Sequence, residues 1–102
     1  MIEFTIQQQL EKDFERYMLK FYTKFKRFSF EDFGKFATTI INYNMQNHLI
    51  DQSQKNEYAY FLTTLFNKGM GNRISEEHLQ LMAQAIAADT SVDFNVINEL
   101  FA

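Results

Sequence analysis

Residue types suited to metal or acid–base chemistry are few in this sequence and lie far apart. The two histidines, His48 and His78, fall in separate predicted helices, and the H-E-x-x-H spacing of a hydrolytic zinc site is absent. Asp51 follows His48 closely, but two ligands do not complete a metal site. We therefore interpret His48 as a residue near a helix C-terminus, where the helix dipole favours a cation.

Other candidate pairs also lack the spacing that catalysis needs. Glu76 and Glu77 are adjacent, so on a helix their side chains diverge by about 100° and suit the helix N-terminus better than a shared proton. The turn Gly69-Met70-Gly71 lacks the Lys-Ser/Thr of a phosphate-binding loop. The chain has no Cys, which excludes disulfides, thiolate nucleophiles and Cys-based zinc or iron–sulfur sites. The sequence predicts a protein that is not an enzyme and has no metal or cofactor.

The most unusual stretch is residues 14–28, FERYMLKFYTKFKRF, which combines an aromatic helix face with a basic edge. Five cations and no acid occur between Arg16 and Arg27. Like-charge neighbours four residues apart cost an isolated helix about 0.2–0.5 kcal/mol per pair. We call the four cations of this edge the basic stripe, and we predict binding through it and two tyrosines beside it: Arg16, Tyr17, Lys20, Tyr22, Lys24 and Arg27.

Several partners would suit the basic stripe. One is internal, because the C-terminal third is acidic and could lie against the first helix or meet it across a dimer. A second is the acidic surface of another protein, with Tyr17 and Tyr22 as contacts. A third is nucleic acid, with the cations on phosphates and Tyr22 or Tyr60 stacked on bases. A membrane surface is a weaker fourth alternative, because the core needs the aromatic face. The last alternative is a solvated face without a partner.

Composition narrows the class of protein. The chain of 102 residues suits a single domain, 1–102, and its net charge of −3 argues against a basic nucleic-acid-binding domain. Twelve Phe and five Tyr exceed what one small core needs, which favours a homo-oligomer or a protein-binding surface. The sequence has no secretory leader pattern and no apolar run near 18 residues, so we expect a cytoplasmic protein without a membrane role.

The pattern predicts an all-α fold, a compact bundle of four to five helices with a long N-terminal helix. There is no Pro and there are only three Gly, so little marks the tight turns that a β-protein needs. The predicted helices cover about 5–28, a second after the cap Ser29, a third that Asp51 or Ser53 caps and Gly69 ends, a fourth after the cap Ser75, and about 92–101. Gly34 lies inside the second helix, where it allows a close helix contact or marks a bend.

The last two predicted helices resemble a helix-turn-helix in length but not in charge. No Lys or Arg follows Arg73, and Asp93 and Glu99 on the last helix would repel phosphates. We therefore predict a small non-enzymatic binding protein, a regulator or inhibitor that acts through contacts with an acidic protein surface. Sixteen Asn and Gln, small size and no Cys are typical of a phage or mobile-element accessory protein. The alternative is a nucleic-acid-associated protein that binds phosphates through the basic stripe.

Overall fold

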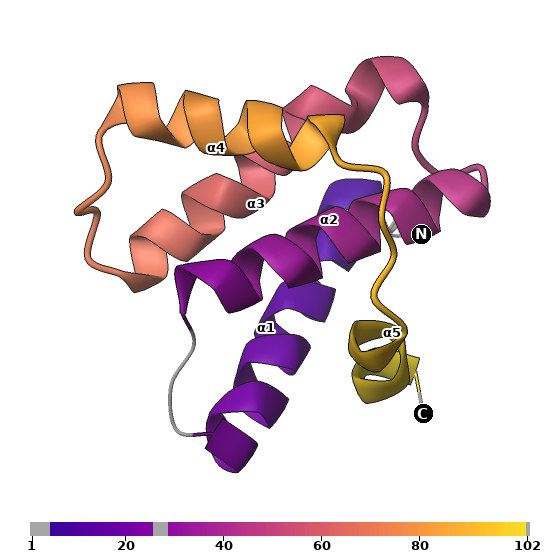
Figure 1. The fold of residues 1–102 in the computed structure, drawn as a ribbon, viewed down its shortest axis with the longest axis horizontal. Coiled ribbons are helices and arrows are strands. Elements are labelled where there is room, and N and C mark those ends of the chain that lie inside the picture. Colours follow the sequence, from indigo (N-terminus) through magenta and orange to yellow (C-terminus); the bar gives the residue numbers. More distant parts are fainter. Residues whose placement is uncertain (1–4, 26–28, 102) are drawn as a thin grey trace.

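The computed structural model describes residues 5–25 and 29–101, and within these ranges the chain is helical without any strand. The predicted all-α bundle with a long first helix is confirmed. The helices are α1 (Ile6–Phe25), α2 (Phe30–Gln46), α3 (Lys55–Gly69), α4 (Glu76–Ala88) and α5 (Phe94–Phe101), with a short 3-10 turn, η1 (Gln52–Gln54), before α3 (Figure 1).

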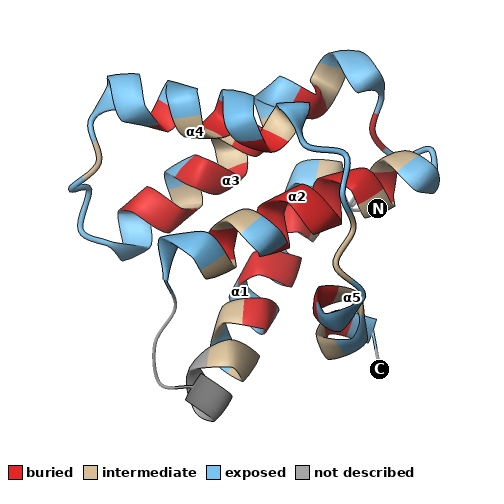
Figure 2. Ribbon diagram, viewed as in Figure 1, coloured by how far each residue is buried: buried red, intermediate tan, exposed pale blue. Residues whose placement is uncertain are grey.

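The helices are arranged around α2. α3 and α4 pack along each other as a hairpin, and α2 contacts α3, α4 and α5 (Figure 1). α1 crosses behind α2 and contacts α3 and α5. Figure 2 shows buried residues along α2 and on parts of α1 and α3, while most of α4 is exposed. The core therefore lies among the first three helices, and α4 and α5 cover its edges.

Aromatic rings form the centre of this core. The Phe33 ring stacks on Phe66 with centroids 4.5 Å apart, and the edge of Phe14 meets Phe33 at 6.0 Å. Phe36 stacks on Tyr17 with centroids 5.0 Å apart. The aromatic face predicted for the first helix is therefore used to join α1 to α2 and, through Phe66, α2 to α3.

Hydrogen bonds to side chains cap three helices at their N-termini, and they confirm the predicted caps Ser29 and Ser75. Thr5 Oγ1 accepts the N–H of Gln8 at 3.1 Å, and the side chain of Ser29 accepts the N–H of Asp32 at 3.2 Å. Ser75 Oγ accepts the N–H of the residue three positions later, His78, at 3.3 Å. These bonds satisfy N–H groups that have no partner within the helix, which fixes where the helices begin.

The helix C-termini are closed by residues in the left-handed conformation. α3 ends at Gly69, as predicted, but the left-handed residue is Gly71, with φ 79°, and the Asn72 N–H bonds to the Asn67 carbonyl at 2.8 Å. This is the Schellman arrangement, in which the residue after the cap has positive φ, and glycine suits that residue best. α2 ends in the same way with His48 at the left-handed position, φ 61°.

The segment between α4 and α5, residues 89–93, is held extended by side chains of α2; we call it the α4–α5 linker. The two N–H groups of the Asn42 amide donate to the carbonyls of Asp89 and Ser91, both at 2.9 Å. Thr39 Oγ1 accepts the N–H of Asp93 at 2.9 Å. The predicted start of the last helix at residue 92 is therefore wrong, because these bonds keep the chain extended and α5 begins at Phe94.

Candidate functional site

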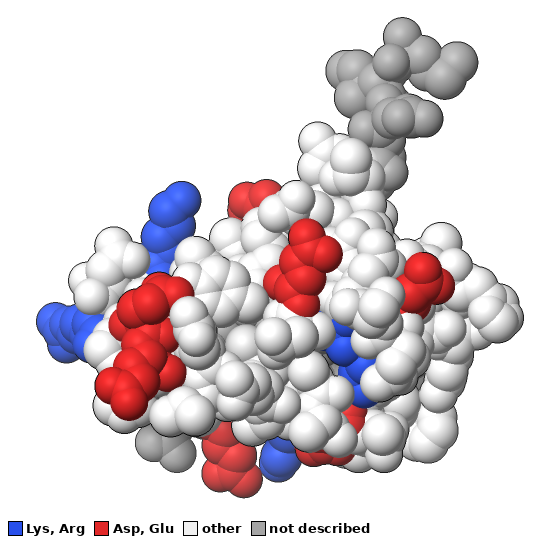
Figure 3. Space-filling model, turned by 90° about the horizontal axis from the view of Figure 1, so that it is seen from above, with Lys and Arg blue, Asp and Glu red and all other residues white. Residues whose placement is uncertain are grey.

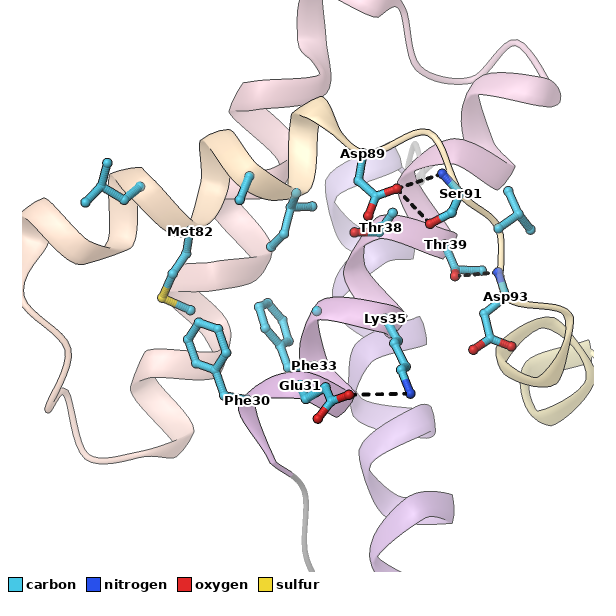
Figure 4. Close-up of a pocket in the computed structure, with 15 residues that line it drawn as sticks. Phe30, Glu31, Phe33, Lys35, Thr38, Thr39, Met82, Asp89, Ser91 and Asp93 are labelled. Atoms are coloured by element: carbon cyan, nitrogen blue, oxygen red, sulfur yellow. Dashed lines mark hydrogen bonds and ion pairs between the residues drawn. The ribbon is translucent and has the colours of Figure 1, made fainter.

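The described residues form an apolar groove between α2, α4 and the α4–α5 linker, which we call the α2–α4 groove. Its volume is about 670 Å³, within the roughly 300–1,000 Å³ range of ligand sites. Side chains from all three segments converge on it (Figure 4). The lining residues are Phe30, Glu31, Phe33, Gly34, Lys35, Thr38, Thr39, Leu81, Met82, Ala85, Ile86, Asp89, Ser91, Val92 and Asp93.

The groove exists because α4 packs mainly on α3 and meets α2 much less. Gly34 adds to the gap, since a Cβ at this position would meet no atom within 4 Å. The interpretation of Gly34 as a close helix contact is therefore wrong. α2 continues through this glycine to Gln46, and a bend at Gly34 stays a prediction. Asn42 and Thr39 hold the linker at the far end, so three separate segments fix the shape of the groove.

Two large apolar side chains remain exposed at this site. Phe30 and Leu81 are each 55 % exposed, although both line the groove. The Phe30 ring contacts Phe66 only edge-on, with centroids 6.1 Å apart, which orients the ring without burying it. Exposed apolar side chains beside an apolar hollow mark a surface suited to contact with another molecule.

The charged residues of the groove already make local ion pairs or hydrogen bonds. Glu31 pairs with Lys35 at 3.9 Å on α2. Asp89 Oδ1 accepts the N–H of Ser91 at 2.9 Å and its hydroxyl at 2.7 Å, and these bonds lower the pKa of Asp89. The lowered pKa keeps this carboxyl ionised at neutral pH, so it does not suit a general acid.

The structure describes three of the six predicted binding residues, and none of these three lines the α2–α4 groove. Arg16 Nη1 donates to the carbonyl of Leu100 at 2.9 Å, and Lys20 Nζ donates to the carbonyl of Glu99. Both cations therefore reach carbonyls in the last turn of α5, which have no partner within the helix. The two cations are thus engaged within the chain, as the internal alternative anticipated.

Tyr17 belongs to the core rather than to an exposed edge. It is 6 % exposed and stacks on Phe36. Burial, together with Asp32 and two further carboxylates, raises the pKa of Tyr17 to about 12. Tyr22 and Lys24 lie in α1, but their side chains are outside the described part of the structure, as is Arg27 altogether. Binding of a partner through these six residues stays a prediction.

The described ranges contain no group of three or more His, Asp or Glu side chains that could hold a metal ion. Within the same ranges, no helix has both the length and the apolar character needed to cross a bilayer.

One buried carboxyl outside the groove gives a pH-dependent prediction. Asp13 on α1 is 2 % exposed and accepts a hydrogen bond from Gln9 Nε2 at 2.8 Å. Burial raises the pKa of Asp13, so the native state binds its proton more tightly than the unfolded chain, whose Asp pKa is about 3.9. The contribution of Asp13 to stability must therefore improve as the pH falls through the native pKa towards the unfolded one.

We expect Asp13→Asn to raise the free energy of unfolding at pH 7, because the amide keeps an acceptor for Gln9 without the buried charge. The gain over the wild type should shrink as the pH falls below the native pKa of Asp13. Urea unfolding at several pH values from about 3 to 7 measures the difference in the free energy of unfolding between the variant and the wild type. Glu11→Gln, an exposed change on the same helix, should leave the pH profile unchanged. A destabilised Asp13→Asn protein at pH 7 would contradict the prediction.

Sequence reasoning did not identify the groove. Leu81 lies off the inward stripe of the fourth helix, and Gly34 is a helix-interior glycine. An apolar residue off the buried face and a glycine inside a helix both indicate a surface that is not fully packed. Neither predicts which two helices would be separated by a groove. The role of the linker residues was not visible either, because it depends on contacts with α2 some 50 residues earlier.

Comparison with protein-family models, with curated proteins and with solved structures found no match.

Proposed function

We propose that this protein is a non-enzymatic binding protein, a regulator or inhibitor that acts through protein–protein contacts, and that it binds an apolar segment of its partner in the α2–α4 groove. The observation that carries the proposal is the apolar groove with Phe30 and Leu81 more than half exposed beside it. Aromatic and aliphatic anchors in a preformed hollow are typical of the energetic centre of protein interfaces.

The groove favours a protein segment over a small enclosed ligand. A small-molecule site typically buries 70–90 % of its ligand. Here Phe30 and Leu81 remain largely exposed, so they suit a ligand that covers the surface around the groove as well as its interior. A protein segment does this because it brings further surface with it.

The basic stripe is less well supported as a nucleic-acid site than the α2–α4 groove is as a protein-binding site. Arg16 and Lys20 donate to carbonyls of α5, so phosphates would compete with bonds already made within the chain. Figure 3 shows the opposite side of the molecule, that of α4, where a few Lys and Arg side chains of the described residues are scattered among acidic and uncharged ones. A groove-binding protein therefore fits the described residues better.

The test uses a substitution that fills the groove. Gly34→Leu places a side chain where a Cβ would meet no atom within 4 Å, and leucine is the better helix former, so the fold should survive. Gly69→Leu is the matched control, because Gly69 is also in a helix with open space around its Cβ and does not line the groove.

We expect peptides selected from a random display library against the wild-type protein to bind Gly34→Leu at least about tenfold more weakly and Gly69→Leu unchanged. Fluorescence anisotropy of the labelled peptides measures this ratio. Backbone amide NMR shifts should move in α2, α4 and the linker when peptide is added. Peptides that bind Gly34→Leu as tightly as the wild type would contradict the groove as the binding surface.

A further inference from the structure

The charges around the α2–α4 groove are unequal in sign. Three carboxylates line it, Glu31, Asp89 and Asp93, against one cation, Lys35. Glu31 and Lys35 offset each other as an ion pair at 3.9 Å, which leaves the two aspartates of the linker. Their carboxylates accept backbone N–H groups, Asp89 from Ser91 and Asp93 from Asn95, bonds that position the linker and leave the negative charges in place.

A buried lysine offsets part of this charge. Lys55 is 4 % exposed, and its ammonium lies 3.4 Å from the backbone carbonyl of Asp89. It contributes to the lowered pKa of Asp89, so the two groups attract each other. Lys55 is held behind the linker and does not line the groove. A ligand in the groove therefore meets the carboxylates directly and Lys55 only through the linker.

A second, smaller cavity extends the acidic surface. It has a volume of about 370 Å³ and shares Lys35 and Asp93 with the α2–α4 groove. Asp32 and Glu99 are added on its far side, so the two hollows together contain five carboxylates and one lysine. The chain after Arg73, which supplies α4, the linker and α5, contains no Lys or Arg. These elements therefore supply no cation that could offset the carboxylates of the groove.

The geometry of the walls favours a helical ligand. The described part of the chain has no strand, so it offers no sheet edge to which an extended peptide could add. The wall formed by α2 carries Gly34, where no side chain keeps an approaching backbone away. Small residues at a helix surface allow another helix to approach closely. An amphipathic helix with apolar anchors three and four residues apart is the recurring ligand of such grooves.

We propose that the α2–α4 groove binds an amphipathic helix of a partner protein whose apolar side chains are flanked by lysine or arginine. The apolar anchors lie between α2 and α4, beside Phe30 and Leu81. The cations face the linker and the smaller cavity, near Asp93 and Asp32. This inference rests on the proposed function of the groove, and it adds the secondary structure and the charge of the ligand.

Three synthetic helical peptides of about 16 residues test the charge. They share the same leucines at i, i+3, i+4 and i+7, and the flanking positions are all Lys, all Gln or all Glu. At about 50 mM NaCl we expect the Lys peptide to bind about tenfold more tightly than the Gln peptide, and the Glu peptide most weakly. The difference between the Lys and Gln peptides should shrink at about 500 mM NaCl. Isothermal titration calorimetry gives the affinities.

Charge-neutral variants of the protein locate the effect. Asp89→Asn/Asp93→Asn keeps an acceptor oxygen at each position but removes two charges, and it should reduce the preference for the Lys peptide severalfold. Glu57→Gln/Glu77→Gln removes the same number of charges from exposed residues that do not line the groove, and it should leave the preference unchanged. Leu81→Ala should weaken all the peptides that bind, because the apolar anchor is common to them.

The outcomes separate this inference from the proposed function. Lys and Gln peptides of equal affinity, or a preference unaltered by Asp89→Asn/Asp93→Asn, would overturn the basic-helix inference while the groove remains a binding site. The inference also fails if the Lys peptide binds Gly34→Leu as tightly as the wild type, since binding would then lie outside the groove. If no peptide binds at low salt, whatever its charge, the proposed function and this inference fail together.

Discussion

Phe33→Ala should lower the free energy of unfolding by about 3–5 kcal/mol, the usual cost of removing a buried phenylalanine ring. Phe33 is 0 % exposed. Its ring joins α2 to α3 by stacking on Phe66 at 4.5 Å, and it also meets Phe14 of α1 edge-on at 6.0 Å. Removing the ring therefore weakens contacts among three helices at once. A domain of this size has about 5–15 kcal/mol of stability, so the loss brings the fold near its limit.

Thermal and urea unfolding followed by circular dichroism measure the loss. In a domain of about 100 residues, each kcal/mol shifts Tm by about 4–8 °C, so a fall of more than 10 °C is expected. Phe94→Ala is the matched control, because Phe94 is also in a helix but is 75 % exposed. Its effect should stay within about 0.5 kcal/mol. Equal effects of the two substitutions would show that the aromatic core is not organised around Phe33.

The fold was largely predictable because its signals are local. Ser29 and Ser75 begin helices through bonds to residues three positions later, and such bonds depend only on nearby sequence. The aromatic face of α1 was also predictable from the spacing of its aromatic residues. The end of α3 at Gly69 was predicted, but the left-handed residue that closes the helix is Gly71, and only the backbone conformation distinguishes the two glycines.

The candidate site was not predictable for a different reason. The groove depends on how far α4 stands from α2, and no local pattern sets that distance. Asn42 holds the linker 47 and 49 residues later in the chain, and a lone amide on a helix gives no sign of such partners. Two cations of the basic stripe, Lys20 and Lys24, have no acid three or four residues away in the sequence, and this absence indicated a distant partner. Arg16 and Lys20 instead donate to backbone carbonyls of α5. Because every residue has a backbone carbonyl, the pattern of charges in the sequence could not identify these partners.

Arg16→Ala/Lys20→Ala should release α5 from α1. α5 has only eight residues, too few for a stable isolated helix, so its order depends on tertiary contacts. Val96 and Leu100 are buried and Phe101 stacks on Tyr43 at 5.0 Å, but the last carbonyls depend on Arg16 and Lys20. Hydrogen bonds from cations contribute about 1.5–3 kcal/mol when buried. These lie partly in solvent, so we expect a combined loss of about 1–3 kcal/mol.

Native-state hydrogen exchange distinguishes this local loss from a global one. The amides of α5 should exchange about 5- to 150-fold faster in the double variant, while α3 and α4 change much less. Arg73→Ala, which removes an exposed cation from the loop before α4, should leave α5 unchanged. Arg16→Lys/Lys20→Arg keeps both cations and should retain most of the protection.

The same experiment determines what the basic stripe does. If Arg16 and Lys20 serve only a partner, α5 exchanges at the wild-type rate in the alanine variant and the internal bonds contribute nothing. If they hold α5, exchange should also rise at the end of the α4–α5 linker, because Asp93 leads directly into Phe94. That linker is one wall of the α2–α4 groove. Cations on the first helix would then help to shape a groove that they do not line.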